Sequence, residues 1–353
     1  MEGFFLGDKP WYHYHDLIAK PLANIVGAKL SEVVAMNQLT VNLHLMMASF
    51  YLPSGKRRKI LCEVKAFPSD QYMLESFCKF IGEHPDEIII EVSHRAGEHL
   101  TRHDDILQKI EEHKEELALV FWSGVNYYTG QVFDIEAITK AAHAAGAKAG
   151  FDLAHAAGNV ILDLHAWNVD FACWCSYKYL NSGPGGIGNA FIHERYHGDA
   201  SLKRLAGWWG YEKDTRFRME KGFKPIQSAE GWQLSTPSII LYATHKSALD
   251  IFEDAGMKRL RAKSKLLSEY LFFLIRDLDI EILTPMTEEW RGCQLSMLIR
   301  KNGKEIFKKL SDAGIFADWR EPDVIRIAPV PLYNTFEEVY AFATLMRSLL
   351  NSK

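Results

Sequence analysis

Strand-like and helix-like segments alternate through the first half of the chain, and this alternation constrains the fold more than any other feature. Short apolar runs separated by amphipathic segments are typical of βαβ units, which build a mostly parallel, doubly wound α/β sheet. Strands are predicted over residues 59–64, 87–92, 117–122 and 147–153, with helices between them over residues 69–81, 104–113 and 134–145.

Beyond about residue 250 the pattern changes to that of a smaller α+β domain. A basic amphipathic helix over residues 257–277 is followed by predicted strands over 280–283 and 293–300, a helix over 304–313, strands near 315–318 and 324–328, and a helix over 335–350. We therefore expect three parts: an N-terminal segment over residues 1–35, a large domain over 36–250 and a small domain over 251–353.

Composition and charge exclude several classes of function. The chain has 353 residues, of which 48% are hydrophobic, and a net charge of −4, which gives no electrostatic reason to expect nucleic acid or an anionic membrane as partner. The five cysteines have no metal-type spacing, and no apolar run is long enough to span a bilayer. These features predict a soluble cytoplasmic protein without a metal site.

A lysine directly after a buried strand is the first candidate for chemistry. Residues 171–175 are apolar and predict a strand, after which come Tyr177, Lys178 and a glycine-rich loop over residues 181–186. Burial can desolvate such an amine and turn it into a nucleophile that forms a Schiff base. The alternative is a lysine that extends to solvent from the strand end, and this stretch alone leaves both interpretations open.

A second strand supplies a partner for this lysine. Residues 147–153 end in Asp152, with His155 three residues later. An acid at the carboxyl end of a strand in an α/β sheet faces the crevice where ligands bind. Alone, Asp152 is more often a helix cap and His155 a structural histidine. A Schiff-base lysine with such an acid is what pyridoxal phosphate requires, because the carboxylate keeps the pyridine nitrogen protonated.

Four further residues each have two interpretations. Thr40 and Thr236 precede apolar helical runs, so each is either a helix cap or a donor to a phosphate. Phe67 lies at a strand-to-helix junction and either stacks on an aromatic cofactor or belongs to the core. Arg326 interrupts an apolar strand and requires a carboxylate, either the protein's own or that of a substrate.

Two glycine-containing segments complete the sequence evidence. Residues 183–188 match the pattern G-x-G-x-x-G, but the residues that follow predict a strand instead of a helix, so we reject a dinucleotide-binding interpretation. The irregular segment over residues 205–231 contains Trp208 and Trp209. A long loop of this kind is usually functional or lies at an interface, and adjacent tryptophans suit a subunit contact and a pocket wall.

With these residues in view, the chain resembles the kynureninase family, a group of fold-type I pyridoxal-phosphate enzymes related to class V aminotransferases. The matching stretches extend over nearly the whole chain. They are MNQLTVNLHL (36–45), KAFPSD (65–70), SGVNYYTGQ (123–131), FDLAHAAG (151–158), VDFACWCSYKYLN (169–181), GWWG (207–210), RGCQL (291–295) and IRIAPVPLYN (325–334).

The resemblance implies a role for each candidate residue. Lys178 would carry the cofactor as a Schiff base, and Asp152 would pair with the pyridine nitrogen. Phe67 would stack on the ring. Arg326 would hold the α-carboxylate of an amino-acid substrate. The remaining cofactor contacts would come from Leu39, Thr40, Asp70, Ser123, His155 and Tyr177.

The resemblance also implies a homodimer, in which Trp208 and Thr236 reach the cofactor of the neighbouring subunit. Some relatives have asparagine where this chain has Thr236, and both side chains can donate a hydrogen bond. The family also has an N-terminal segment that completes the small domain and precedes the region matching residues 7–11. We expect this chain to lack that segment.

The activity implied is hydrolysis of L-kynurenine, or its 3-hydroxy form, to anthranilate or 3-hydroxyanthranilate and L-alanine, within tryptophan catabolism and NAD biosynthesis. Tyr177 is the candidate proton relay, and Trp208 and Trp209 would line the pocket for the aryl group. The alternatives are another class V lyase, such as a cysteine desulfurase, and a pyridoxal-phosphate-binding dimer that is inactive because the N-terminal segment is missing.

Overall fold

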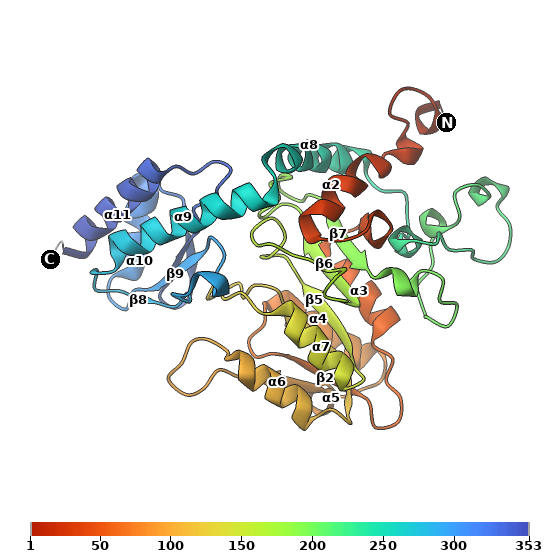
Figure 1. Ribbon diagram of the computed structural model, residues 1–353, viewed down its shortest axis with the longest axis horizontal. Helices are drawn as coiled ribbons and strands as arrows, with labels where there is room; N and C mark the ends of the chain where they lie inside the picture. Colours follow the sequence, from red (N-terminus) through yellow and green to blue (C-terminus); the bar gives the residue numbers. More distant parts are fainter. Residues whose placement is uncertain (1, 352–353) are drawn as a thin grey trace. The chain divides into compact units, whose positions relative to one another are not determined.

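The computed structural model describes residues 2–351, which form two compact units (Figure 1). Among these residues, the first unit comprises the chain up to Ser93, Thr101–Gly124 and Asp134–Asp254. The second comprises His94–Leu100, Val125–Phe133 and the chain from Ala255. The expected N-terminal segment over residues 1–35 thus lies in the first unit, and two loops expected in the large domain belong to the second.

A seven-stranded sheet forms the centre of the first unit, in the order β1-β7-β6-β5-β4-β2-β3. The pairs from β3 to β6 are parallel, whereas β7 is antiparallel to both of its neighbours. The strands are β1 (Val33–Ala35), β2 (Lys59–Glu63), β3 (Ile89–Val92), β4 (Leu117–Ser123), β5 (Lys148–Asp152), β6 (Phe171–Cys175) and β7 (Gly188–Ile192).

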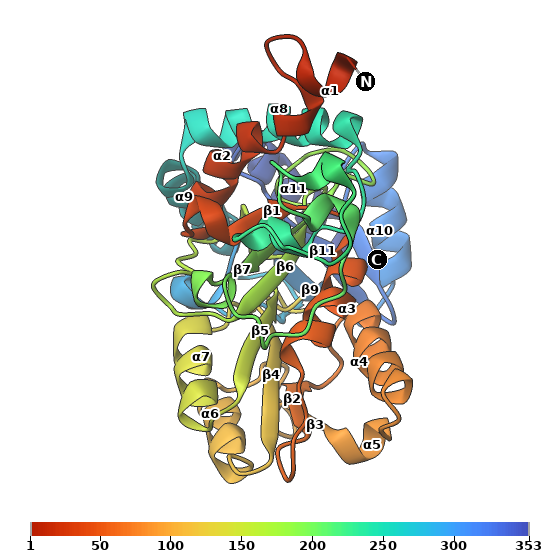
Figure 2. The ribbon, with the colours of Figure 1, turned by 90° about the vertical axis from the view of Figure 1, so that its right-hand side faces the viewer.

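Helices cover both faces of this sheet, with α6 and α7 on one side and α3 and α4 on the other (Figure 2). The predicted mostly parallel, doubly wound α/β fold is therefore confirmed. The helices of this unit are α1 (Glu2–Phe5), α2 (Asp16–Val26), α3 (Leu39–Phe50), α4 (Pro68–Phe80), α5 (Pro85–Ile88), α6 (His103–Glu112), α7 (Ile135–Ala144) and α8 (Ile239–Ala255).

Close packing between β5 and β6 fixes the two strands that matter most for the site. Gly150 in β5 pairs with Phe171 in β6, and both lie in the buried interior. A Cβ atom on Gly150 would lie 2.0 Å from the Phe171 ring, so only glycine leaves room for this phenylalanine. The Phe171 ring also stacks on Phe50 of α3, with centroids 4.9 Å apart.

The second unit is built on a four-stranded antiparallel sheet in the order β10-β11-β9-β8. Apolar residues of one sheet face, such as Met297 and Ile325, form a core with Leu271 and Met346 from the helices. The strands are β8 (Glu281–Ile282), β9 (Leu295–Leu298), β10 (Asp318–Arg320) and β11 (Val324–Ile327), and the helices are α9 (Met257–Ile275), α10 (Gly303–Asp312) and α11 (Phe336–Asn351).

Several predicted boundaries need correction. Residues 87–88 belong to the short helix α5, which begins at Pro85 because proline fits the first turn of a helix. The strand expected near residues 315–318 starts at Asp318. The sequence patterns also missed β1, which has only three residues and so shows no periodicity.

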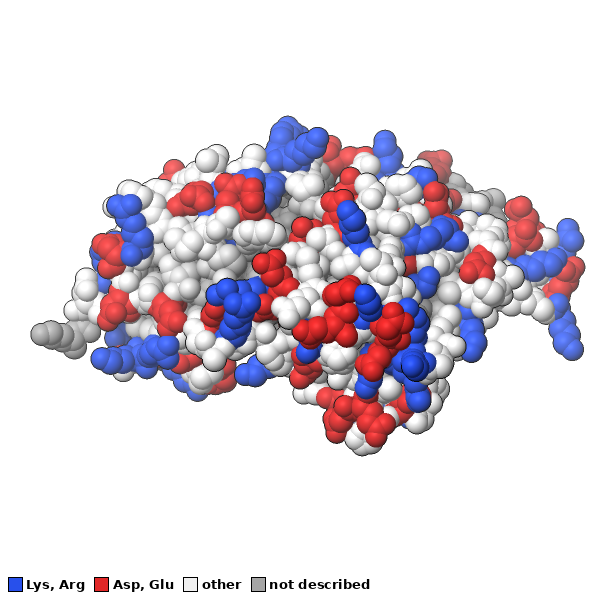
Figure 3. Space-filling model, turned by 60° about the horizontal axis from the view of Figure 1, so that its bottom comes forward, with Lys and Arg blue, Asp and Glu red and all other residues white. Residues whose placement is uncertain are grey.

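None of the described helices is both long and apolar enough to cross a membrane. On the face drawn in Figure 3, the described lysine and arginine side chains are interspersed with aspartate and glutamate. This surface therefore presents mixed charge, as the net charge of −4 suggests.

Candidate active site

Lys178 lies in the loop that connects β6 to β7. Hydrogen bonds close this loop at its base: Ser176 Oγ donates to Ile187 O at 2.6 Å, and Ser182 N donates to Ser176 O at 3.1 Å. A Cβ atom on Gly186 would lie 2.1 Å from Ser182 Oγ, so the closed loop requires glycine there. The loop therefore holds Lys178, which is half-buried, near the carboxyl end of β6.

Asp152 is the last residue of β5 and pairs with Cys173 of the neighbouring β6. Its side chain is buried, and Oδ1 accepts a hydrogen bond from Ala154 N at 2.7 Å. Burial raises the pKa of Asp152, while the nearby Lys178 amine and the Ala154 N–H oppose that rise. The expected acid and lysine thus lie within electrostatic reach of each other.

A second buried acid, Asp70, is hydrogen-bonded to Asp152. It lies in the first turn of α4. Burial and then the negative charge of Asp152 raise the pKa of Asp70 well above its ordinary value. Two carboxyl groups this close cannot both ionise readily, so Asp70 keeps its proton and donates it toward Asp152. The pair therefore carries a single negative charge near Lys178.

Phe67 provides an aromatic face beside the lysine. It is the residue preceding α4, and its ring centroid lies 5.4 Å from Lys178 Nζ. A planar ring attached at Lys178 would find Phe67 in stacking range.

The first turns of α3 and α4 meet through two hydroxyl groups. Thr40 Oγ1 and Ser69 Oγ lie 2.7 Å apart, and Leu39 begins α3. The residue preceding the helix is Gln38, so the interpretation of Thr40 as a helix cap is wrong. Unpaired N–H groups at two helix starts, with hydroxyls alongside, suit a phosphate.

Ser123 is the last residue of β4, and its hydroxyl donates to the carboxylate of Glu63 at 2.9 Å. Glu63 is buried at the end of β2, the strand next to β4. Sequence reasoning missed Glu63, although it carries the same signal that identified Asp152: an acid at the carboxyl end of a buried strand.

Two other expected site residues, His155 and Tyr177, are close in sequence to Asp152 and Lys178. The ring of His155 is 5.8 Å from that of Tyr179 in an edge-to-face arrangement. Tyr177 is 43% exposed, and its hydroxyl is hydrogen-bonded to the thiol of Cys175. Burial and then the Cys175 side chain raise the pKa of Tyr177.

The two tryptophans have different environments. Trp209 is buried: its ring lies 5.8 Å from that of Tyr12, and the Arg216 guanidinium stands 4.4 Å from its centroid. Trp208 is 39% exposed, and its Nε1 donates to Arg216 O at 3.4 Å. Trp209 therefore packs within its own unit, whereas Trp208 has an open side.

Thr236 is exposed and precedes α8 by three residues. The side chain that caps the helix belongs to Ser238, whose Oγ accepts a weak hydrogen bond from Leu241 N at 3.5 Å. The interpretation of Thr236 as the helix cap is therefore wrong.

Arg326 belongs to the second unit, where β11 carries it. Its Nε donates to Asp318 Oδ2 at 2.9 Å, Nη2 donates to the same oxygen, and Nη1 donates to Tyr127 O. The arginine thus has the protein's own carboxylate as one partner.

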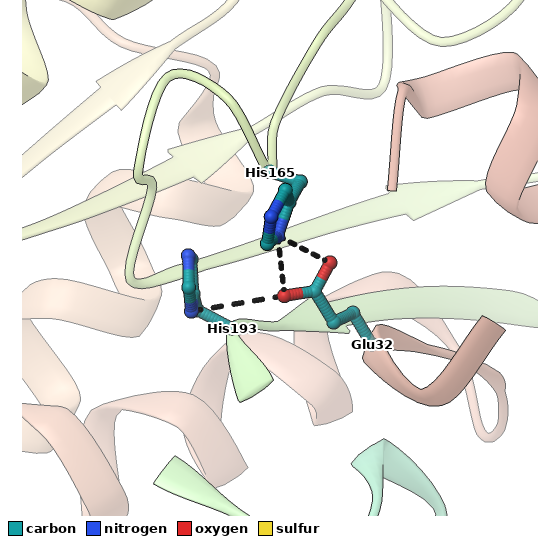
Figure 4. Close-up of side chains that lie close together, drawn as sticks. All are labelled: Glu32, His165 and His193. Atoms are coloured by element: carbon teal, nitrogen blue, oxygen red, sulfur yellow. Dashed lines mark hydrogen bonds and ion pairs between the residues drawn. The ribbon is translucent and has the colours of Figure 1, made fainter. Parts of the chain in front are cut away.

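Outside these residues, Glu32, His165 and His193 form a cluster (Figure 4). Glu32 Oε1 lies 2.9 Å from His165 Nδ1 and 3.7 Å from His193 Nδ1. The two rings lie face to face, with centroids 5.0 Å apart and an interplanar angle of 23°. Glu32 also accepts from the backbone N–H groups of Lys29 and Glu194, as a structural link between segments does.

Comparisons with known proteins identify the family. The chain is 52% identical to the kynureninase of Flavobacterium psychrophilum over 98% of its own length and 83% of that protein. It is 49% identical to the kynureninase of Nematostella vectensis, over 96% and 76% of the two chains. The chain belongs to the kynureninase family. In addition, residues 260–346 match the kynureninase C-terminal domain.

Solved structures share the fold of this kynureninase relative at low sequence identity. A cysteine desulfurase from Thermococcus onnurineus superposes with a TM-score of 0.80 at 20% identity, over 96% of this chain and 84% of that one. The cystine C–S lyase C-DES, in complex with cysteine persulfide, gives 0.80 at 17% identity, over 97% and 89%. These likenesses establish the fold-type I architecture.

The residues around Lys178 fit pyridoxal phosphate, the cofactor of the kynureninase family. The buried Asp70–Asp152 pair holds one negative charge that requires a cationic donor, and a pyridinium N–H is such a donor. Phe67 offers a stacking face, Lys178 an amine for covalent attachment, and the first turns of α3 and α4 hydroxyls for the phosphate.

Proposed function

We propose that the protein hydrolyses L-kynurenine, or its 3-hydroxy form, to the corresponding anthranilate and L-alanine with pyridoxal phosphate bound to Lys178. The proposal rests on one arrangement: a half-buried lysine beside an aromatic ring and a buried acid pair with a single negative charge. When bound, the cofactor supplies a ring that withdraws electrons from the substrate's α-carbon.

Each side chain has a defined task in this proposal. Lys178 attaches the cofactor and then removes the proton from the substrate's α-carbon. Asp152 stays negative opposite the pyridine nitrogen, because Asp70 supplies it with a hydrogen bond. Phe67 limits the tilt of the cofactor ring. Tyr177, half-exposed beside the lysine, relays protons during cleavage of the carbon–carbon bond.

The working unit that we propose is a cytoplasmic homodimer. Trp208 is exposed on one side and Thr236 is exposed on the same unit, as residues that complete a neighbouring subunit's site must be. Ser123, His155 and Leu39 complete the cofactor contacts within the subunit. Arg326 binds the substrate carboxylate, and Trp208 and Trp209 form the side of the site that receives the aryl group.

The decisive experiment uses purified protein loaded with pyridoxal phosphate. We expect visible absorbance from the bound cofactor in the parent protein and its loss in Lys178→Ala. We also expect the parent protein, but not Lys178→Ala, to release fluorescent anthranilate from L-kynurenine. Lys140→Ala, which changes an exposed lysine of α7, is the matched control and keeps both signals. A parent protein that binds the cofactor but releases neither anthranilate from L-kynurenine nor 3-hydroxyanthranilate from 3-hydroxy-L-kynurenine would contradict the proposed reaction.

The same preparation tests the desulfurase alternative. That chemistry needs a reactive cysteine on an exposed segment, whereas all five cysteines are buried. We therefore expect no sulfide from L-cysteine under conditions in which kynurenine is consumed.

A further inference from the structure

We propose that Asp318 and the Tyr127 carbonyl are positioning groups for Arg326, and that they fix its guanidinium so that two N–H donors remain for a substrate carboxylate. This inference rests on the proposed function, because it assumes that the ligand of Arg326 is an amino acid. It gives a role to two sequence stretches, residues 123–131 and 291–295, for which the reaction alone provides no complete explanation.

The donor count of Arg326 is the first argument. A guanidinium is planar and has five N–H donors. Nε and Nη2 donate to Asp318 Oδ2, and Nη1 donates to the Tyr127 carbonyl. Asp318 Oδ2 thus binds the edge formed by Nε and Nη2, and the Tyr127 carbonyl binds Nη1, so the guanidinium is held at two separate points of its plane. Two N–H groups then remain, the number that a carboxylate accepts in a bidentate pair.

The charge balance around Asp318 is the second argument. Asp318 lies directly opposite Arg326 in the antiparallel pair β10–β11. Arg320 also contacts Asp318 Oδ2, with its Nη2 at 3.0 Å. Two guanidinium groups therefore share one carboxylate, which leaves an excess positive charge beside an arginine side chain that is only 10% exposed. A ligand carboxylate would neutralise this excess.

The Tyr127 carbonyl is itself held in place, which is the third argument. Gln294 Nε2 donates to Tyr127 O at 3.0 Å and to Tyr128 O at 3.3 Å. Ser296 Oγ donates to Tyr128 O at 2.5 Å, and Thr284 Oγ1 to Thr129 O at 2.6 Å. Three successive carbonyls are thus bound by buried side chains of the second unit.

The loop that contains Tyr127, residues 125–133, is also held by hydrogen bonds between its own residues. Asn126 Oδ1 accepts hydrogen bonds from Tyr128 N at 2.9 Å and from Thr129 N at 2.8 Å. Such an Asx-type turn restricts the backbone before and after Tyr127. Gln294 therefore acts on Arg326 through a rigid peptide group, and Asp318 acts on it directly.

The test compares two ligands that differ only in the carboxylate. L-Kynurenine and kynuramine, the amine that lacks the carboxylate, are titrated into holoenzyme, and binding is followed by the change in cofactor absorbance. In Asp318→Asn we expect affinity for L-kynurenine to fall about tenfold, the factor that corresponds to the weakening of one charge-assisted contact, and affinity for kynuramine to stay unchanged. In kinetics, KM rises while kcat stays within about twofold.

The matched control is Asp277→Asn, which removes a carboxylate paired with Arg347 in the same unit and leaves both affinities unchanged. Gln294→Leu provides a second variant, with a smaller loss for L-kynurenine only. The inference would be overturned if Asp318→Asn lost affinity for L-kynurenine and kynuramine equally, or lost affinity for neither. A parent protein that fails to bind L-kynurenine would instead contradict the proposed function itself.

Discussion

The proton shared by Asp70 and Asp152 sets the charge of the candidate site, and it makes the stability of the cofactor-free protein depend on pH. The folded-state pKa of Asp70 is raised by burial and by Asp152. At pH values between the pKa of Asp70 in the unfolded chain and its pKa in the folded protein, the folded protein therefore binds more protons than the unfolded chain. The stabilising contribution is complete below the unfolded pKa and is lost as the pH rises through the folded pKa.

Asp70→Asn should remove the part of the stability loss at rising pH that comes from ionisation of Asp70. Asparagine keeps a hydrogen-bond donor toward Asp152 but has no proton to lose. We expect urea unfolding to show that, from pH 5 to pH 8, stability falls less or rises more in the cofactor-free variant than in the cofactor-free parent. Asp86→Asn, which changes a carboxylate that is 92% exposed, is the control. A variant with the parent's pH slope would mean that Asp70 does not retain its proton.

Some site residues could be predicted from sequence because their signal is local. Lys178 and Asp152 each follow or end a buried strand, and strand ends meet at one edge of a parallel sheet. The proton sharing between Asp70 and Asp152 could not be predicted, because it depends on the distance between two side chains 82 positions apart in sequence. The link between Asp318 and Arg326 required the register of β10 and β11.

At the level of elements, the packing of β5 against β6 determines whether Asp152 and Lys178 can meet. A Cβ atom on Gly150 would clash with the Phe171 ring, which has no space to move in the buried interior. We expect Gly150→Ala to lower the free energy of unfolding by about 2–3 kcal/mol, as overpacking of a core does. Denaturant unfolding measures this loss.

Two further variants make this prediction specific. Gly198→Ala is the control, because its Cβ would meet only Gln227 Oε1 at 3.4 Å, an ordinary contact. Phe171→Leu combined with Gly150→Ala should regain part of the stability, since the smaller side chain removes the clash. If Gly150→Ala is as stable as the parent, the two strands do not pack as described.

The elements themselves follow from sequence where periodicity is long enough to be read. The helix predicted over residues 134–145 and the strand over 171–175 agree with α7 and β6. Of the two interpretations of Thr236, the helix cap is the wrong one, because Ser238 carries the same sequence signal two residues further on and accepts the hydrogen bond from Leu241 N. The short β1 becomes visible only through its pairing with β7.

For the whole molecule, two buried histidines predict a loss of stability in mild acid. Burial lowers the pKa of His193 and of His245 to about 4. As the pH falls from about 6.5 toward 4, the unfolded chain takes up protons that the folded protein cannot accept, so stability falls. Asp170 adds little in this window, because His143 and Arg195 lower its pKa to about 2 despite its burial, so most of its contribution is lost only below about pH 4.

His245→Gln should therefore flatten the stability profile between pH 6.5 and 4, as measured by denaturant unfolding at several pH values. His245 Nε2 contacts Asn189 Oδ1 at 3.1 Å, and a glutamine amide can replace that donor. His94→Gln, on an exposed residue, serves as the control. An unchanged profile in the His245 variant would argue that other groups cause the acid sensitivity.

The proposed dimer makes a separate prediction about shared sites. Lys178→Ala and Trp208→Ala each remove one group, and we expect each homodimer to be inactive or nearly so. If Trp208 serves the neighbouring subunit, a hybrid dimer has one site with both changes and one with neither. Mixing the two variants should then restore about a quarter of the parent's activity. No recovery after verified subunit exchange would place Trp208 in its own subunit's site.

The five buried cysteine thiols can be used to measure local opening of the folded protein. Cys173 and Cys175 are two positions apart in β6 of the first unit, and Cys293 lies in the second unit. Opening of each unit can therefore be measured separately. An alkylating reagent followed by mass spectrometry should modify these sulfurs only when the surrounding structure opens. Loading with pyridoxal phosphate should slow modification of Cys175 and leave the rate at Cys293 nearly unaltered.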